Sequence, residues 1–466
     1  MQITFSHKKY FITKLIACVA FCGVFFILSC QPSSENKKIK FITLDPGHFH
    51  AALVQKSMYP DVDTTVYIYS TDGEDLRSHL NRINGYNSRT DNPTHWNEVV
   101  YTGADFMEKM IAEKKGNVVV LSGNNEKKTD YILQSLQNGF HVFADKPMVI
   151  DAVGFEKLKQ AFDIAAKNKV LLYDIMTERF EITTVLQKEL SMIPEILGNL
   201  EKGTADNPAI TKESVHHFYK QVSGNILTRP AWFLDTRQQG EGIVDVMTHL
   251  VDLVQWECFP EQTLDYKKDI SVTSAKRWTT ALSLNQFKAI TKQDSFPDFL
   301  KQVANDSILN IFCNGEINYE LKGIHAKTVV TWNYQAPEGT GDTHYSIMRG
   351  TKSNLIIRQG KEEAYKPVLY IEPIVNDQAF ETGLIENFKK ISSRFKGVEL
   401  EKSAAGWRIK IPQELNEDHE GHFGRVTNNF LQYVKNNNMP SWEVPNMLAK
   451  YYTTIQGLEI AKKNNQ

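Results

Sequence analysis

Short apolar runs alternate with helix-like segments along the first third of the chain. Five runs have the length and composition of buried strands: residues 39–44, 64–70, 117–122, 140–144 and 170–175. Two segments repeat apolar residues with a helical period: residues 130–139 and 154–169. Strands that alternate with helices predict βαβ units and a parallel sheet. We therefore expect an α/β domain over residues 39–176 that binds its ligand beyond the carboxyl ends of the strands.

The first thirty residues follow a different pattern. Three lysines precede an apolar run of about fourteen residues, and the run ends in ILSC, which resembles the lipobox of bacterial lipoproteins with Cys30 as the lipidated residue. The run is shorter than the ~20 residues that a membrane-spanning helix needs. We expect a signal peptide over residues 1–30 and a polar tether over residues 31–38. The mature chain would then be extracytoplasmic, held by its lipid anchor at the outer membrane and facing the periplasm.

The turn after the first strand lies where a dinucleotide-binding fold places its phosphate-binding glycines. In LDPGHFHAAL, Asp45, Gly47 and His50 occupy the three glycine positions, so only the central glycine is present. Gly47 still allows a close backbone approach, and the N–H groups of a helix that starts near His48 and Phe49 can still bind a pyrophosphate. An ordinary turn before a helix is the alternative interpretation.

Polar residues follow two further strands. The strand at 117–122 leads into short side chains that can hydrogen-bond a ribose or a nicotinamide: Ser122, Asn124 and Asn125. The strand at 140–144 leads into Asp145, Lys146 and Pro147. Because Pro147 favours an extended conformation of the residue before it, Lys146 should point its ammonium group into the crevice. A donor fixed at this position is suited to binding a ligand.

The residues at these strand ends resemble a known family. The order of SGNN, an amphipathic helix and NGFHVFADKP is similar to the Gfo/Idh/MocA oxidoreductases, whose pattern is T-P-N, helix, A-G-K-H-V-x-x-E-K-P. TERF around Arg179 resembles the arginine-aromatic pair of the family. GEGIVDVMTHLVDLVQW resembles a second signature, G-G-G-x-x-x-D-x-G-x-H-x-x-D, through these residues: Gly240, Gly242, Asp245, His249 and Asp252.

The resemblance implies a fold and a chemistry. It implies a Rossmann-type N-terminal domain and, over residues 177–466, an α+β substrate domain with an open, mainly antiparallel sheet. The implied reaction is hydride transfer between a sugar carbon and a nicotinamide cofactor. Lys146 and His249 are the proton-transfer candidates, because both residue types can be tuned to act near neutral pH. Asp245 would bind the substrate or hold His249.

The second signature also has a physical interpretation of its own. Asp245, His249 and Asp252 are spaced i, i+4 and i+7, which places them on one face of a helix whose other residues are mostly apolar. Unpaired carboxylates are costly to bury, so these groups need partners or a catalytic task. A structural network, with Asp245 paired to a basic residue, is the alternative to catalysis. We favour a structural role for Asp252.

Cofactor and substrate specificity depend on further positions. An acid that ends the second strand receives the ribose hydroxyls of NAD, and Asp72 lies two residues after Ser70 at this point. We expect NAD if Asp72 takes this role, and NADP is possible if Ser70 does. Four residues are candidates for substrate binding: Arg179, His217, Trp232 and Arg237.

The charge balance and the candidate ligands decide what we expect of nucleic acid and metal as partners. The chain has 466 residues with 53 basic and 55 acidic side chains, so no net field favours nucleic acid. His48 with His50, His216 with His217, and Asp245 with His249 could supply metal ligands. However, the sequence has no HExxH, and after the predicted lipidation site only the widely separated Cys258 and Cys313 remain. We therefore expect no bound metal.

The sequence leads to one preferred function and two alternatives. We expect a nicotinamide-dependent oxidoreductase that acts on a sugar with a tightly bound cofactor. Tight binding follows from the expected location, where free NAD is scarce. The first alternative is a glycoside-cleaving enzyme of the same fold that is assisted by oxidation. The second is a carbohydrate-binding lipoprotein without catalysis. The resemblance also allows a homo-oligomer.

Overall fold

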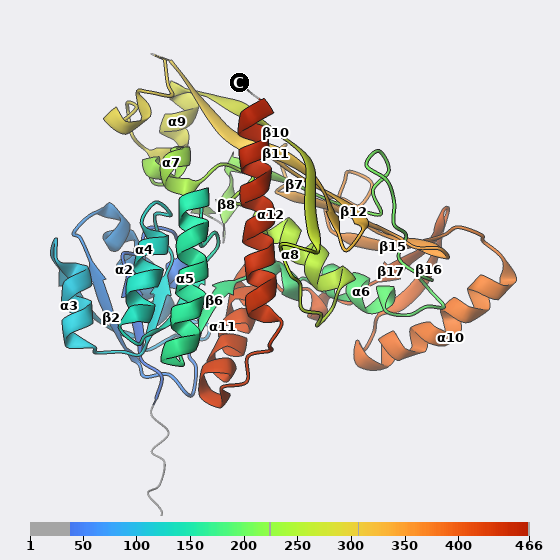
Figure 1. Ribbon diagram of the computed structural model, residues 1–466, viewed down its shortest axis with the longest axis horizontal. Coiled ribbons are helices and arrows are strands. Elements are labelled where there is room, and N and C mark those ends of the chain that lie inside the picture. Colours follow the sequence, from blue (N-terminus) through green and yellow to red (C-terminus); the bar gives the residue numbers. More distant parts are fainter. Residues whose placement is uncertain (1–37, 223–224, 306, 465–466) are drawn as a thin grey trace, which may run out of the picture. The chain divides into compact units, whose positions relative to one another are not determined.

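Buried apolar strands build the N-terminal sheet. In the computed structural model, the residues described are 38–222, 225–305 and 307–464. The sheet has six strands in the order β3-β2-β1-β4-β5-β6, and all neighbours pair in parallel (Figure 1). The strands are β1 Phe41–Leu44, β2 Thr65–Ser70, β3 Asn97–Thr102, β4 Val118–Leu121, β5 His141–Asp145 and β6 Leu172–Ile175. Every residue of β1 and β4 is buried, as expected for central strands covered on both faces.

Helices connect these strands. They are α1 His50–Leu53, α2 Glu74–Ser88, α3 Phe106–Glu113, α4 Lys128–Gln137 and α5 Ala152–Asn168. The side chain of Asp151 caps α5 by accepting a hydrogen bond from the N–H of Gly154. The predicted strands and the helices α4 and α5 are present, whereas β3 was not predicted. Val99 and Val100 of this edge strand are exposed, so its sequence lacks the apolar run that marks the other strands.

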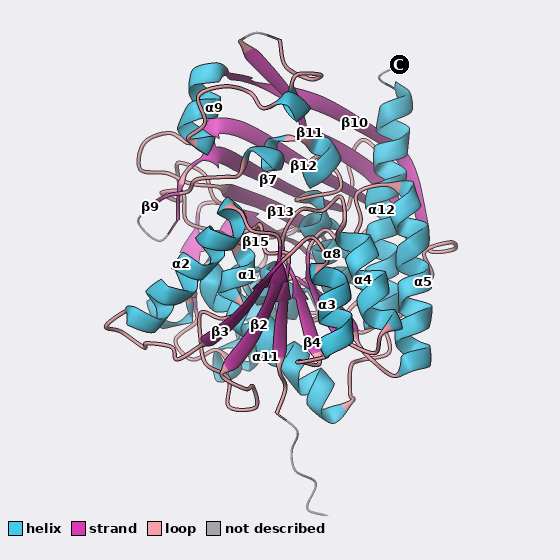
Figure 2. Cartoon of the chain, turned by 90° about the vertical axis from the view of Figure 1, so that its left-hand side faces the viewer, coloured by secondary structure: helices cyan, strands magenta, loops and turns pink. Residues whose placement is uncertain are grey.

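The second sheet has nine strands, and most neighbours in it pair antiparallel. Its order is β10-β11-β12-β7-β13-β14-β15-β17-β16, with only β7 and β12 paired in parallel among the described neighbours. The strands are β7 Ile210–Tyr219, β10 Ile270–Ser283, β11 Ile308–Leu321, β12 Ile324–Gln335, β13 Thr343–Arg349, β14 Ser353–Arg358, β15 Val368–Pro373, β16 Glu399–Ser403 and β17 Gly406–Lys410. Strands β8 Gln221–Val222 and β9 Asn225–Ile226 form a separate pair. Figure 2 shows strands of both sheets. The predicted fold class is confirmed.

Helices of the second half pack on both sheets. They are α6 Ile182–Ser191, α7 Thr236–Gln239, α8 Met247–Cys258, α9 Leu284–Thr291, α10 Gln378–Arg394, α11 His419–Asn436 and α12 Glu443–Asn464. Short 3₁₀ helices are η1 Thr177–Phe180, η2 Ala231–Leu234, η3 Asp298–Leu300 and η4 Gln413–Leu415. Helix α12, red in Figure 1, contacts α5, α8 and β10, while α11 contacts β6. In the described part of the chain, no helix is both long and apolar enough to span a bilayer.

Residues 265–303 and the region around residue 176 can be compared with what the sequence indicates. Residues 265–303 look in the sequence like an insertion with its own helix, but 270–283 form β10, a full strand of the large sheet paired with β11. The predicted domain boundary at residue 176 lies just after β6, yet one cluster of buried apolar side chains runs through both halves, and the boundary stays a prediction. The signal peptide, Cys30 and residues 31–37 lie outside the described residues.

A buried network of charges joins the two halves. Lys450 of α12 is fully buried, and its ammonium lies 2.7 Å from Oδ2 of Asp174 on β6 and 2.9 Å from Oδ1 of Asp252 on α8. Arg179 of η1 donates to both carboxylate oxygens of Asp252, at 2.6 and 2.7 Å, and to Glu443 at 3.1 Å. Because an unpaired buried charge costs several kcal/mol, each member needs all of its partners in place.

Removing the central cation tests this network. Lys450→Met keeps the side-chain volume but leaves Asp174 and Asp252 short of a partner, so the free energy of unfolding should fall by about 3–5 kcal/mol. The measurement is urea unfolding followed by circular dichroism. Lys410→Met, which removes one member of an exposed pair with Glu399, is the matched control and should unfold at nearly the wild-type midpoint. Equal midpoints for both variants would contradict the structural role of the network.

Candidate active site

An ion pair lies where the two halves of the chain meet. Nζ of Lys146, at the end of β5, is 2.6 Å from Oδ1 of Asp245, which lies in the turn before α8. Both side chains are at least nine-tenths buried. Gln239 of α7 donates to the other oxygen, Oδ2, at 3.1 Å. The peptide bond between Lys146 and Pro147 is cis. The structure therefore shows the arrangement in which Asp245 pairs with a basic residue. That residue is Lys146, which is itself one of the two candidates for proton transfer.

His249 lies on the first turns of α8. Among the described residues its Nδ1 has no hydrogen-bond partner although the atom is buried. Burial lowers the pKa of His249 well below its ordinary value, and the nearby ammonium of Lys146 lowers this pKa further. The imidazole is therefore neutral near pH 7 and can accept a proton or a hydrogen bond. Its free nitrogen distinguishes it from Lys146 and Asp245, which already have partners.

The predicted three-residue stripe on one helix face is only partly correct. Helix α8 begins at Met247, so His249 and Asp252 lie on it while Asp245 precedes it. Asp252 pairs with Arg179 and Lys450 rather than with His249, in line with the structural role that we favoured. A helical period in the sequence does not fix where the helix starts, and here the preceding turn carries the carboxylate that faces Lys146.

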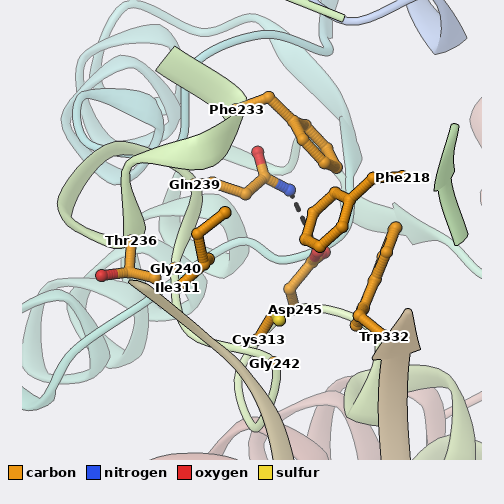
Figure 3. A pocket seen from close by; sticks show the side chains of 10 residues that line it. All are labelled: Phe218, Phe233, Thr236, Gln239, Gly240, Gly242, Asp245, Ile311, Cys313 and Trp332. Carbon is orange, nitrogen blue, oxygen red and sulfur yellow. Dashed lines mark hydrogen bonds between the residues drawn. The ribbon is translucent and has the colours of Figure 1, made fainter. Parts of the chain in front are cut away.

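Asp245 also faces a small cavity (Figure 3). The cavity has a volume of about 10 Å³, which is room for roughly one water molecule. Its walls are Phe218, Phe233, Thr236, Gln239, Gly240, Gly242, Asp245, Ile311, Cys313 and Trp332. A Cβ on Gly242 would lie 1.8 Å from the carbonyl oxygen of Cys313, so only glycine lets this turn approach β11. The signature glycine thus places Asp245 beside an aromatic wall.

The β1–α1 turn differs from a glycine-rich phosphate loop. Asp45, at the first glycine position, has a φ of 46° and accepts hydrogen bonds from Ser70 and Tyr131. Asp is among the few residue types that adopt this left-handed conformation readily. The N–H groups of Gly47 and His48 donate to the carbonyl of Ser122. Helix α1, His50–Leu53, has only four residues. The expected helix that would bind a pyrophosphate through its N-terminus is therefore reduced to a single turn.

Two histidines of this turn gather around Asp145. Nδ1 of His50 forms a hydrogen bond of 3.0 Å with Oδ2 of Asp145, and Nδ1 of His48 lies 3.4 Å from the same oxygen. The hydroxyl of Ser122 donates to this oxygen at 3.0 Å. Burial favours the neutral acid, but His50, His48 and Lys128 hold the pKa of Asp145 well below its usual range. Asp145 is therefore an ionised carboxylate that is hydrogen-bonded to His50 and Ser122 and lies close to His48.

A tryptophan of the second half packs on the same turn. The indole N–H of Trp232 donates to Oδ2 of Asp75 at 2.9 Å, and a Cβ on Gly47 would lie 3.1 Å from both the indole and that oxygen. The side chain of Asp72 is 75% exposed and pairs with Arg77. The acid that faces the turn is thus Asp75 rather than the predicted Asp72. Sequence spacing alone could not show that the first turn of α2 brings Asp75 inward.

The remaining substrate candidates have other partners in the structure. The guanidinium of Arg179 binds Asp252 and Glu443, which gives it a structural role, and its contact with substrate stays a prediction. Arg237 is half-exposed and bonds to Asp235 and to the loop at 299–302. His217 and His216 both direct Nδ1 at Asp342, at 3.1 Å each, and the ammonium of Lys220 joins them. This cluster around Asp342 was not predicted.

Comparison with known proteins decides the family. Residues 49–174 match the model described as "Oxidoreductase family, NAD-binding Rossmann fold", and residues 186–462 match "Putative oxidoreductase C terminal domain". The chain belongs to the Gfo/Idh/MocA oxidoreductase family. It is 54% identical to a protein of Parabacteroides merdae assigned as an oxidoreductase, and the match covers 92% of this chain and 98% of the other with a TM-score of 0.90. Among curated proteins, none matches the chain.

More distant solved structures share the fold of this Gfo/Idh/MocA protein. Levoglucosan dehydrogenase in complex with NADH and levoglucosan is 12% identical, with 91% of this chain and 98% of the other covered and a TM-score of 0.59. GenD2 from gentamicin A biosynthesis, in complex with NAD, is 13% identical, with 92% and 95% covered and a TM-score of 0.54. At these identities the likeness shows the fold alone. The predicted family and NAD(P) as its cofactor are confirmed.

Two buried polar atoms, one in the loop after β4 and one on α8, are available to such a cofactor. Oδ1 of Asn125 and Nδ1 of His249 are buried and have no hydrogen-bond partner among the described residues. The main chain and amide of Asn125 bind the carbonyls of Gln238 and Gln239, and Asn124 donates to Gln238, so these side chains are held in place. Buried polar atoms are normally satisfied, so these two unpaired ones fit the polar groups of a bound nicotinamide. The residues present therefore fit that half of the cofactor.

Asp75 gives the site a measurable dependence on pH. Burial raises the pKa of Asp75 to about 6, above the ~3.9 of an unfolded chain. Between these values the folded protein keeps a proton that the unfolded chain has lost. The unfolding free energy of wild type, relative to Asp75→Asn, should therefore fall as pH rises from about 4 to about 6 and be level above about 7. Urea unfolding of both proteins across this range measures the difference.

The control for this prediction is Asp72→Asn. It removes an exposed carboxylate from the same loop, and its unfolding should follow wild type at every pH. A constant difference between wild type and Asp75→Asn over the whole range would show that Asp75 is not the buried acid of the turn.

Proposed function

We propose that the protein transfers hydride between a sugar or sugar derivative and a nicotinamide cofactor that it retains. The observation that carries the proposal is the buried pair of Lys146 and Asp245, with the neutral His249 nearby, at the carboxyl end of the parallel sheet. Oxidation of an alcohol needs a group that removes the hydroxyl proton while hydride leaves the same carbon. Two proteins of similar fold support a sugar-like substrate. One is levoglucosan dehydrogenase, solved with levoglucosan bound, and the other is GenD2 from gentamicin A biosynthesis.

Each residue of the site has a distinct task in this proposal. When bound, the nicotinamide accepts or donates the hydride. Lys146 holds the reacting oxygen by hydrogen bonding, and Asp245, 2.6 Å away, keeps the ammonium in position and balances its charge. His249 accepts the hydroxyl proton through a neutral ring. Next to Asp245 lies an aromatic wall of Phe218, Phe233 and Trp332. This wall excludes water, which strengthens the electrostatic interaction between Lys146 and Asp245.

The choice between NAD and NADP follows from Asp75. This carboxylate lies against Gly47, and with a pKa of about 6 it is mostly ionised at neutral pH. A carboxylate beside the β1–α1 turn accepts hydrogen bonds from ribose hydroxyls and repels a 2′-phosphate. We therefore propose NAD as the preferred cofactor, with Asp75 in the role first expected of Asp72.

Retention of the cofactor follows from the contact between Trp232 and Asp75. Trp232 belongs to the second half of the chain and covers Gly47 of the first half, so this contact must open before anything lying along the turn can leave. A retained cofactor requires the chemistry to close on itself, either by oxidising one sugar and reducing another or by re-reducing the same sugar. A chain that works where free NAD is scarce needs such a cycle.

The location is proposed from the N-terminal sequence. The apolar run that ends at Cys30 predicts a lipid anchor at the outer membrane. Wild type should fractionate with membranes, and Cys30→Ala should not gain the lipid. Mass spectrometry of the N-terminus measures the lipid directly. An unlipidated wild-type chain in the soluble fraction would contradict the proposal.

Substitutions in the pair and the histidine test the catalytic assignment. Lys146→Ala and His249→Ala should each lower turnover of sugar by about 10²-fold or more, because the first removes the group that holds the reacting oxygen and the second the group that accepts its proton. Turnover is measured with a panel of sugars and polyols at saturating NAD, and folding is checked by circular dichroism. His325→Ala, in a pair with Glu320 on the large sheet, is the control and should keep wild-type turnover. Near-normal rates in both site variants would reject the assignment.

The fate of the nucleotide tests retention. Protein purified without added cofactor should release NAD(H) on denaturation, as detected by mass spectrometry of the supernatant. Added NAD should not be consumed in step with a single sugar, because the reduced cofactor stays bound. Trp232→Ala should release the nucleotide during purification. Steady accumulation of free NADH by a protein that carries no nucleotide would overturn this part of the proposal.

A further inference from the structure

Two histidines and one carboxylate converge beneath the β1–α1 turn. His50 is the first residue of α1, and His48 lies two residues before it. Asp145 is the last residue of β5, so the fold brings together residues far apart in the sequence. One ligand atom from each of the three side chains lies within 4.8 Å of the other two. Among the described residues, this is the one group of at least three His, Cys, Asp or Glu side chains with such spacing.

The distances within the cluster suit a metal ion. Ligand atoms at roughly 2.0–2.2 Å from a tetrahedral ion lie about 3.3–3.6 Å from one another. The two contacts from Nδ1 to Oδ2 of Asp145, at 3.0 Å for His50 and 3.4 Å for His48, already lie close to this separation. The ligand atoms of the two imidazoles lie within 4.8 Å of each other, so binding an ion would bring them closer together. Nδ1 of His48 makes no hydrogen bond in the described structure, so binding an ion would satisfy it.

The donor set points to a class of ion. Two imidazoles and one carboxylate form the facial set that binds divalent first-row transition metals, in contrast to the oxygen-only sets that bind Mg²⁺ and Ca²⁺. Three protein donors leave at least one coordination position for water or another ligand. We propose that His48, His50 and Asp145 bind one divalent transition metal ion such as Zn²⁺ or Fe²⁺. The site revises the expectation from the sequence that the chain binds no metal.

Neighbouring residues orient the three ligands. The hydroxyl of Ser122 donates to the Asp145 carboxylate at 3.0 Å, as second-layer groups do in metal sites. Phe233 stacks on the ring of His48, and Phe423 lies against the ring of His50. Lys128 is buried close by, but its ammonium donates to the main-chain oxygen of Asp145 rather than to the carboxylate. The carboxylate therefore has no lysine on it that an ion would have to displace.

The cluster around Asp342 provides an internal contrast. It also has two histidines and one aspartate, with Nδ1 of His216 and of His217 each 3.1 Å from the carboxylate. The ammonium of Lys220 already occupies this carboxylate. A divalent cation would meet a fixed positive charge there, so we expect no metal at Asp342. The two clusters have the same residue types, and the position of a lysine distinguishes them.

The metal content of the full-length mature protein tests the proposal. The purified protein is stripped with a chelator, mixed with Zn²⁺ or Co²⁺, and passed through gel filtration before elemental analysis. One equivalent of metal per chain should remain bound, and Co²⁺ should give visible d–d absorption bands of nitrogen and oxygen ligation. Metal content is measured without nicotinamide and without turnover. Its result is therefore independent of the proposed function. Less than about a tenth of an equivalent in wild type would overturn the proposal.

Substitutions assign the ion to its ligands. His48→Gln and His50→Gln should each lower occupancy at least tenfold and abolish the Co²⁺ bands, while His217→Gln should keep one equivalent. Circular dichroism shows whether each variant is folded. If a variant does not fold, the Co²⁺ spectrum of wild type still decides, because bands unchanged from those of aqueous Co²⁺ would contradict ligation by imidazole. Full occupancy in His48→Gln and His50→Gln, or its loss in His217→Gln, would place the ion elsewhere and overturn the assignment.

Discussion

The buried charges around Lys450 constrain how the two halves of the chain meet. One lysine and one arginine share three carboxylates that come from β6, α8 and α12. Burying these groups costs solvation energy that only complete pairing offsets, so the network tolerates few alternative arrangements of the elements that carry it. Helix α8 is fixed in this way against the parallel sheet. The turn before α8 is therefore fixed as well, and Asp245 of that turn meets Lys146 at the end of β5.

The β1–α1 turn departs from the usual form of a phosphate-binding loop. In a glycine-rich loop, backbone N–H groups and a full helix receive the pyrophosphate. Here Asp45 forms the tight turn with a left-handed backbone, Ser122 accepts the N–H groups, and His48 and His50 fill the space above Asp145. Trp232 reaches the turn from the second half of the chain. Side chains and a contact from the second half of the chain thus occupy the turn that glycines and a full helix form elsewhere.

Apolar runs in the sequence predicted the central strands well, because strands buried on both faces have a pattern that no polar surface interrupts. The same reasoning missed β3, a sheet-edge strand whose adjacent Val99 and Val100 are exposed, and treated β10 as part of an insertion. It chose Lys146, Asp245 and His249 as candidates from motifs, and the structure pairs the first two, but it placed Asp245 on a helix that starts two residues later. Asp75 and the tasks of Arg179 depend on contacts between residues far apart in the chain, which spacing cannot reveal.

The central claim is that the ion pair of Lys146 and Asp245 holds the alcohol that passes its hydride to the nicotinamide. Single-turnover reduction of the protein-bound nicotinamide, followed by its near-ultraviolet absorbance after mixing with levoglucosan, glucose or myo-inositol, tests this claim most directly. We expect reduction in wild type, a rate at least about 10²-fold lower in Asp245→Asn, and an unchanged rate in Glu316→Gln, which alters a pair with Lys327 on the large sheet. Equal rates in wild type and Asp245→Asn, or no reduction of the wild-type cofactor by any of the three compounds, would contradict the account.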